Sequence, residues 1–102
     1  MSITVRIKDD DDVEIAVAGR FDVAIQREFR QAYESLEKGP SGRRYLIKLD
    51  KADYMDSAAL GMLLHLQKFT GARKADLHIS GANDTIRRTL SIAGFERFFT
   101  IE

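Results

Sequence analysis

The sequence predicts an α/β domain with a mixed, mainly parallel β-sheet of about four or five strands, an N-terminal β-hairpin and about three helices packed on the sheet. Apolar residues alternate with polar ones near the start of the chain, and two later segments are short, nearly continuous apolar runs. Helical periodicity fills the stretches between the later strands. Because strands that alternate with helices are joined by crossover connections, most of the sheet should be parallel.

The N-terminal hairpin is predicted from two alternating segments that flank an acidic run. Ile3–Ile7 and Val13–Val17 each place their apolar residues on one face, and Asp9–Asp12 lies between them. Aspartate tolerates turn geometry, and this run lacks the ordered spacing, the glycine and the closing glutamate of a calcium loop. We therefore expect a solvated turn there rather than a metal site, and we expect Gly19 to end the second strand.

Periodicity and capping residues predict the remaining elements. Asp22 suits the N-cap of a first helix, in which apolar residues recur at three- and four-residue steps up to Leu36. A second helix is apolar around much of its circumference and therefore central; it runs from about Ser57 to Thr70 and stops at Gly71. The other expected features are the close of the first helix at 39–42, interior strands covered on both faces at 45–49 and 76–80, a short helix over about 84–93, and a final short strand at 98–101.

Length and composition indicate one domain that spans residues 1–102. The 102 residues include 16 Lys and Arg against 16 Asp and Glu, so the formal net charge is zero. A balanced charge argues against a general affinity for nucleic acid or for an anionic membrane. The chain has no cysteine, which excludes disulfides, thiol catalysis and cysteine zinc sites. Its start does not resemble a signal peptide and no apolar run approaches about 20 residues, so we expect a cytoplasmic protein with no membrane partner.

The most informative position is the expected start of the central helix. Partners of mainly parallel sheets usually meet the loops at the carboxyl ends of strands, here expected at residues 19–22, 50–57 and 81–84. The second of these loops ends in Asp56-Ser57, where free backbone amides of the helix would stabilise a phosphate on Ser57. Serine and aspartate are also common N-caps, so the position alone leaves both roles open.

The element order and two segments together resemble the STAS domain family, most closely the bacterial anti-sigma factor antagonists. The segments are residues 19–22, Gly-Arg-Phe-Asp, and residues 54–63, Tyr-Met-Asp-Ser-Ala-Ala-Leu-Gly-Met-Leu. The family signature is an Asp-Ser pair followed by two small residues and Leu-Gly, and the resemblance extends from Ile3 to about Ile101. One departure is the pair Ala58-Ala59, which stands where members commonly have Ser-Gly or Thr-Gly.

The resemblance implies a STAS-like fold and a regulator that switches partners under the control of phosphorylation, without enzymatic activity or a cofactor. Ser57 falls on the position that a partner serine kinase phosphorylates, and Asp22 falls near the same surface. The unphosphorylated domain would bind an anti-sigma factor that is also a serine kinase of the histidine-kinase-like ATPase type, and a serine phosphatase would reset the phosphorylated form. The predicted partner-binding residues are Phe21, Asp22, Asp53, Tyr54, Met55, Asp56, Ser57, Ala58 and Ala59, with contact area from Phe21, Tyr54 and Met55 if their apolar faces are exposed.

Other functions fit the residues less well. A hydrolase that used Ser57 would need a base, but His65 lies about two helical turns away and His78 falls in a strand, and two histidines make a poor metal site. A response-regulator receiver would use Asp50, but it needs an acidic cluster after the first strand, where this chain has a hairpin. Two alternatives near the STAS fold stay open: a scaffold subunit of a stress-signalling complex, and a non-phosphorylated accessory subunit of a lipid ABC transporter ATPase.

Overall fold

The computed structural model describes residues 3–8, 10–36 and 43–102 and contains a five-stranded sheet in the order β1-β2-β3-β4-β5. The strands are β1 (Ile3–Ile7), β2 (Val13–Phe21), β3 (Tyr45–Met55), β4 (Leu77–Ser80) and β5 (Thr100–Ile101). β1 runs antiparallel to β2, and each later pair of neighbours is parallel. The predicted mixed, mainly parallel sheet with an N-terminal hairpin is therefore confirmed.

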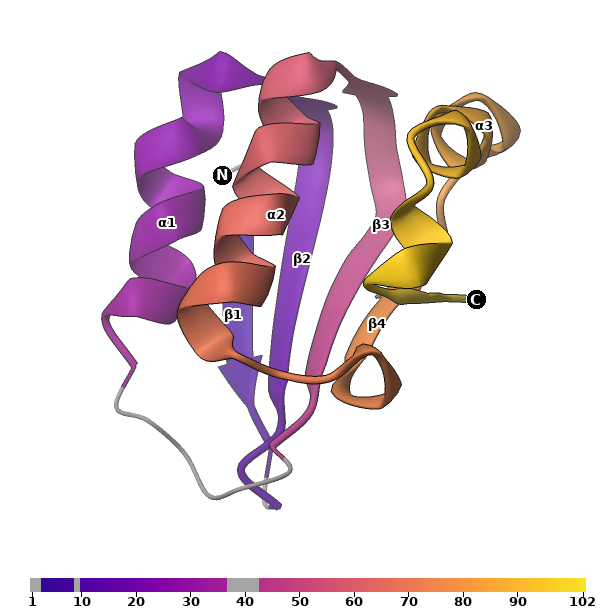
Figure 1. Cartoon of the computed structure of the whole chain (residues 1–102). Coiled ribbons are helices and arrows are strands. Elements are labelled where there is room, and N and C mark those ends of the chain that lie inside the picture. The colour runs from indigo at the N-terminus through magenta and orange to yellow at the C-terminus, as the bar shows by residue number, and fades with distance from the viewer. Residues whose placement is uncertain (1–2, 9, 37–42) are drawn as a thin grey trace.

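The described part of the chain has three α-helices, which follow the second, third and fourth strands. They are α1 (Gln26–Glu34), α2 (Ser57–Thr70) and α3 (Asp84–Ile92), with single-turn 3₁₀ helices η1 (Val23–Ile25), η2 (Lys74–Asp76) and η3 (Phe95–Arg97) beside them. Crossovers between parallel strands are right-handed, and here each one moves to the next strand in the same direction across the sheet. All three helices therefore lie on one side of the sheet, with α1 and α2 next to each other (Figure 1).

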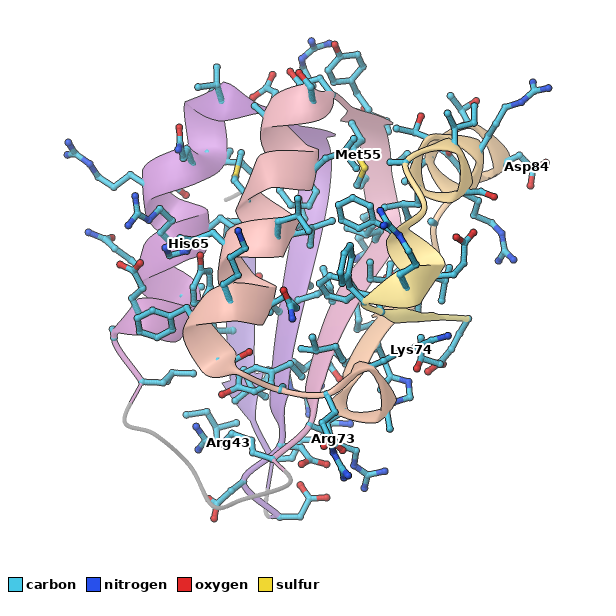
Figure 2. All side chains as sticks on the ribbon, viewed as in Figure 1. Arg43, Met55, His65, Arg73, Lys74 and Asp84 are labelled. Carbon is cyan, nitrogen blue, oxygen red and sulfur yellow. The ribbon has the colours of Figure 1, made fainter. Side chains whose placement is uncertain are left out.

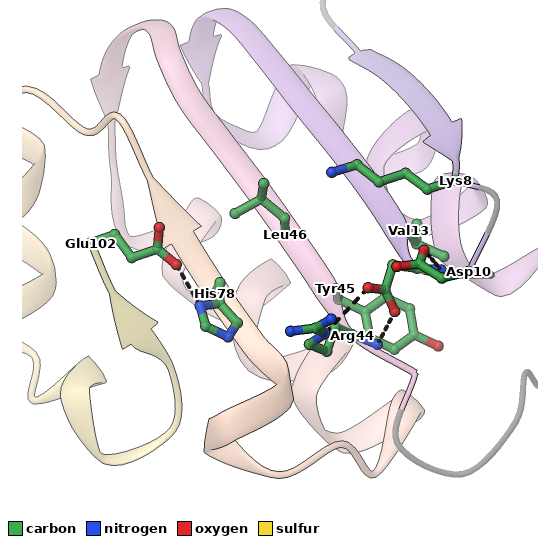
Figure 3. Close-up of a pocket in the computed structure, with 9 residues that line it drawn as sticks. Lys8, Asp10, Val13, Arg44, Tyr45, Leu46, His78 and Glu102 are labelled. Atoms are coloured by element: carbon green, nitrogen blue, oxygen red, sulfur yellow. Dashed lines mark hydrogen bonds and ion pairs between the residues drawn. The ribbon is translucent and has the colours of Figure 1, made fainter.

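One face of the sheet is packed and the other is open. On β3, Ile47 and Leu49 are fully buried, whereas Leu46 and Lys48, which point the other way, are only half-buried. Figure 3 views part of the sheet from the open side, with the strands in front of the helices. The expectation of interior strands covered on both faces is wrong, because the described helices share one side.

The open face carries a cluster of charges around one carboxylate. Glu14 of β2 is only 8% exposed, and its carboxylate oxygens lie 3.5 Å from Lys8 Nζ, 3.7 Å from Arg6 Nη1 and 3.9 Å from Lys48 Nζ. These cations offset the cost of partly removing the Glu14 carboxylate from water.

The core is a single cluster of buried side chains from the sheet and the helices. At its centre, the fully buried ring of Phe29 on α1 has its centroid 5.0 Å from that of Phe21 and 5.7 Å from that of Tyr33. Burying an aromatic side chain of this size stabilises a fold by roughly 1.5–3 kcal/mol. The apolar residues of α1, which recur at the predicted three- and four-residue steps, therefore face the sheet.

β2 and β3 are longer than predicted. β2 passes through Gly19, which has a φ of 81°, and ends at Phe21, while β3 continues to Met55. Their register shifts between Ala16 and Ala18 and again between Gly19 and Arg20, and these irregularities let the pairing continue where the alternation of polar and apolar residues is broken. Gly19 therefore does not end its strand, and the expected loop before Ser57 is mostly strand.

The hairpin turn and the helix ends lie close to the predicted residues. The amide of Lys8 donates to the carbonyl of Asp12 at 2.8 Å, and Asp11 adopts a φ of 67° in the turn. α2 has the predicted bounds and ends at Gly71, which has the left-handed φ of 65° that favours glycine. α1 already ends at Glu34, and the predicted stop at residues 39–42 lies outside the described residues. None of the described helices is long and apolar enough to span a membrane.

Candidate functional site

The carboxyl ends of β2 and β3 meet the start of α2 at one end of the sheet. Arg20 pairs with Tyr54 and Phe21 with Met55 in the parallel register, and α2 begins at Ser57, two residues after β3 ends. Figure 1 shows the ends of β2 and β3 and the first turn of α2 at the same end of the molecule. The fold therefore brings the predicted segments 20–22 and 53–58 to a common edge, which we call the Ser57 edge.

Asp56 and Ser57 have different environments at this edge. Asp56 is the N-cap of α2, because its Oδ1 atom accepts from the amide of Ala59 at 3.2 Å and its carbonyl accepts from the amide of Leu60 at 3.3 Å. Ser57 is the first residue of the helix, its side chain is exposed, and its hydroxyl makes no hydrogen bond to any described residue. The capping role left open by the sequence thus belongs to Asp56.

A second polar group at the same edge joins β2 to β3. The Arg20 Nε atom donates to Asp22 Oδ2 at 3.1 Å, and the Arg20 guanidinium carbon lies 3.9 Å from the centroid of the Tyr54 ring. The other oxygen of Asp22 accepts from the amide of Ala24 at 3.0 Å, so Asp22 caps η1, the short turn that leads into α1. The hydrogen bond to Asp22 raises the pKa of Arg20 above its already high value. Asp22 is therefore an N-cap as predicted, but of η1 and not of α1, whose N-cap is Ile25. Arg20 is a residue that the sequence did not single out.

Three of the predicted partner-binding side chains lie below the surface. Phe21 and Ala59 are fully buried and Met55 is 9% exposed. Figure 2 shows the Met55 side chain directed into the molecule between α2 and α3. The condition set for Phe21 and Met55, that their apolar faces be exposed, is therefore not met, because both side chains belong to the core, as does Ala59.

The other predicted side chains remain accessible at the Ser57 edge. Asp53 and Ser57 are exposed and Tyr54 is 38% exposed, while Asp22, Asp56 and Ala58 are half-buried. Val23, next to Asp22, is 64% exposed and adds an apolar side chain that the sequence did not single out. These side chains form a mixed polar and apolar surface of the kind that contacts proteins.

The two histidines interact with residues other than Ser57. His65 Nδ1 is hydrogen-bonded to the hydroxyl of Tyr33 between α2 and α1, and His65 Nε2 lies 3.6 Å from Glu34 Oε2. Burial raises the pKa of Tyr33 to about 12. His78 on β4 contacts the carboxylate of Glu102 at 2.5 Å. Neither histidine is a base for Ser57, and no group of three His, Cys, Asp or Glu in the described ranges could hold a metal ion.

A pocket of about 280 Å³ lies at the opposite end of the sheet, where β2 and β3 begin. Four of the polar side chains that line it form two pairs: Arg44 Nε lies 3.2 Å from Asp12 Oδ2, and His78 contacts Glu102 (Figure 3). The carboxylate of Asp12 has its pKa lowered, first of all by the hydrogen bond from the backbone amide of Arg44. These pairs brace the hairpin turn and the C-terminal strand, and the Ser57 edge remains the better candidate.

Residues 3–101 match a family model described as "Mlab, STAS domain". The chain belongs to the STAS domain family. The resemblance found in the sequence is thereby confirmed, and it covers nearly all of this STAS domain.

Relatives of this STAS domain include proteins of two kinds by name. It is 39% identical over 93 residues to a STAS-domain containing protein of Pseudomonas aeruginosa (strain UCBPP-PA14), which covers 91% of this chain and 90% of the relative. It is 28% identical over 102 residues to the anti-sigma-B factor antagonist of Listeria monocytogenes, which covers 100% of this chain and 89% of the relative. The predicted likeness to anti-sigma factor antagonists is therefore confirmed.

Solved structures share the fold of this STAS domain. The unphosphorylated anti-sigma factor antagonist SpoIIAA superposes with a TM-score of 0.68 at 13% identity, over 98% of this chain and 86% of that one. A sulfate transporter family protein from Wolinella succinogenes has a TM-score of 0.66 at 19% identity, over 84% of this chain and 74% of that one. Because one fold serves both kinds of protein, the function has to be argued from the Ser57 edge.

Proposed function

We propose that this STAS domain is an anti-sigma factor antagonist that switches partners when Ser57 is phosphorylated. The observation that carries the proposal is the separation of roles at the start of α2, where Asp56 caps the helix and the exposed Ser57 hydroxyl has no hydrogen-bond partner among the described residues. A phosphate can therefore be added without removing a cap. The relationship to the anti-sigma-B factor antagonist of Listeria monocytogenes supports the same class of function.

In the unphosphorylated state, the accessible residues of the Ser57 edge would contact the partner, an anti-sigma factor that is also a serine kinase of the histidine-kinase-like ATPase type. We assign this contact to Ser57 and its accessible neighbours Asp22, Asp53, Tyr54, Asp56 and Ala58. The kinase transfers the γ-phosphoryl group of its ATP to the Ser57 oxygen, so an O–P bond forms, the bond to ADP breaks and the hydroxyl proton passes to a base of the kinase. The domain itself is a substrate and regulator, acting in the cytoplasm and holding no cofactor.

Phosphorylation would release the partner for an electrostatic reason. A phosphate adds about −1.5 to −2 charges, and the backbone amides at the start of α2 stabilise it in the free domain. In the complex the same phosphate would lie in a contact surface, where it must find new cations or lose its hydration. The free domain therefore gains stability from the phosphate while the complex loses it, until a serine phosphatase removes the group.

The first experiment tests Ser57 as the phosphate acceptor. The unphosphorylated domain serves as bait in a pull-down, and the kinase that it retains is used in the assay. We expect that kinase with ATP to add one phosphate to the wild-type domain and none to Ser57→Ala, as measured by intact mass. Ser91→Ala, which removes an exposed hydroxyl on α3, is the matched control and should still gain the phosphate. A phosphate gained by Ser57→Ala would contradict the assignment.

The switch itself is tested by calorimetry with the same kinase. Ser57→Glu should bind at least about tenfold more weakly than wild type. Its melting temperature should stay the same or rise, because acidic residues are stabilising in the first turn of a helix. Ser91→Glu should bind like wild type. Equal affinities for wild type and Ser57→Glu would contradict the switch and favour an accessory subunit of a lipid ABC transporter ATPase, which needs no phosphorylation.

A further inference from the structure

We propose that Arg20 is the residue through which the Ser57 edge binds an acidic side chain of the partner, and that Asp22 acts by holding Arg20 in place. This inference rests on the function proposed above. Part of the contact expected of Asp22 passes to Arg20, which lies in the same predicted segment and which the strand register pairs with Tyr54.

The hydrogen bonds of Asp22 leave it little capacity for a partner. One carboxylate oxygen accepts from the Ala24 amide at 3.0 Å and the other from Arg20 Nε at 3.1 Å, and only 16% of the side chain is exposed. A carboxylate in this position caps a turn and orients a neighbour. Its own charge is matched by that of Arg20.

Arg20, in contrast to Asp22, has hydrogen-bond donors left for a partner. Its side chain is 63% exposed, yet it is held at two points, by Asp22 at Nε and by the Tyr54 ring 3.9 Å below the guanidinium. A guanidinium has five N–H donors, and the bond to Asp22 uses one of them. Because the side chain is already oriented, forming a paired contact with a carboxylate costs less conformational entropy than it would for a free arginine.

The position of Arg20 connects this contact to the switch. Arg20 pairs with Tyr54 across the parallel strands, and the chain reaches Ser57 three residues after Tyr54. A partner that lies over Ser57 therefore meets the Arg20 side chain on the same edge. The partner chemistry that fits is a surface carboxylate, since the planar fork of arginine matches a carboxylate in two parallel hydrogen bonds.

The test separates positioning from capping by using amide side chains. Asp22→Asn keeps an oxygen for the Ala24 amide but loses the charged acceptor for Arg20, and Arg20→Gln removes the cation while leaving the cap. Calorimetry against the serine kinase defined above should show each variant binding about tenfold more weakly than wild type. The double variant should be no weaker than the single ones, because both changes disrupt one arrangement. Arg88→Gln, at an exposed arginine on α3, is the control and should bind like wild type.

Two further measurements, the salt dependence of binding and the affinity of Arg20→Lys, distinguish a binding role of Arg20 from a merely structural one. The affinity of wild type should fall more steeply with salt than that of Arg20→Gln, and Arg20→Lys should restore only part of the affinity. Wild-type affinity in Arg20→Gln, in a domain whose binding still responds to Ser57→Glu, overturns this inference alone. Additive losses in the double variant overturn the positioning role of Asp22. Absence of binding by the wild-type domain overturns both this inference and the proposed function.

Discussion

Neighbouring residues at the start of α2 separate the capping of the helix from the signalling role proposed for Ser57. Asp56 holds the first turn through the Ala59 amide, and Ser57 projects into solvent one residue later. Had the serine been the cap, a phosphate would have replaced the group that satisfies the helix amides. The one-residue offset therefore leaves the Asp56 cap in place whatever group the Ser57 oxygen carries.

Tyr33 supplies a pH prediction at the residue scale. Burial, and then the charge of Glu34, raises the pKa of Tyr33 to about 12, while an unfolded tyrosine ionises near pH 10. The folded form keeps the proton longer, so the stability due to neutral Tyr33 is complete below about pH 10 and is lost as the pH rises to about 12. We expect the free energy of unfolding to fall more over this range in wild type than in Tyr33→Phe, as measured by urea titration. Parallel losses in the two proteins would contradict the assignment.

At the element scale, Gly81 allows the loop between β4 and α3 to pass close to β3. Gly81 has a φ of 77°, and a Cβ atom there would lie 2.9 Å from the backbone nitrogen of Asp50. We expect Gly81→Ala to lower the free energy of unfolding by about 1–3 kcal/mol, from positive φ and from overlap. Gly61 lies in α2 with open space around its Cβ position, so Gly61→Ala should instead stabilise by up to about 1 kcal/mol. Urea unfolding of both variants tests the pair, and equal effects would argue against the close approach at Asp50.

The elements predicted most accurately are those for which the apolar periodicity and the capping residues indicate the same bounds. α2 begins and ends at the predicted residues because an N-cap at Asp56, a long apolar pattern and Gly71 all give the same bounds. The extension of β3 to Met55 was missed because its outward residues are polar and its alternation is interrupted by register shifts. Strand pairing with β2, which is a tertiary interaction, decides the conformation there.

The same limit applies to the functional site. Asp22 and Ser57 were placed on one edge from the element order, and the structure agrees. The burial of Phe21 and the role of Arg20 depend on which residues face inward after the irregularity at Gly19. A sequence pattern does not carry that information, because one residue of slip exchanges the two faces of a strand.

On the scale of the whole molecule, a single core predicts a single cooperative unfolding transition. Phe29 is fully buried at the centre of that core, whereas Phe69 is 44% exposed at its border. We expect Phe29→Ala to cost about 3–5 kcal/mol and Phe69→Ala clearly less, with one transition in each case. Differential scanning calorimetry measures both quantities. Two separate transitions, or equal costs, would contradict a single core that is centred on Phe29.

The two edges of the sheet also determine how the domain meets other proteins. β5 has only two residues, and β1 is a short strand that bears Arg6 and is followed by Lys8. Short, charged edges are poor templates for an added strand, so copies of this domain do not readily polymerise through their backbones. In the switch proposed above, recognition is left to side chains at the Ser57 edge, whose contacts a single phosphate would disrupt. A partner that paired with an edge strand through main-chain hydrogen bonds would stay bound whether or not one serine was phosphorylated.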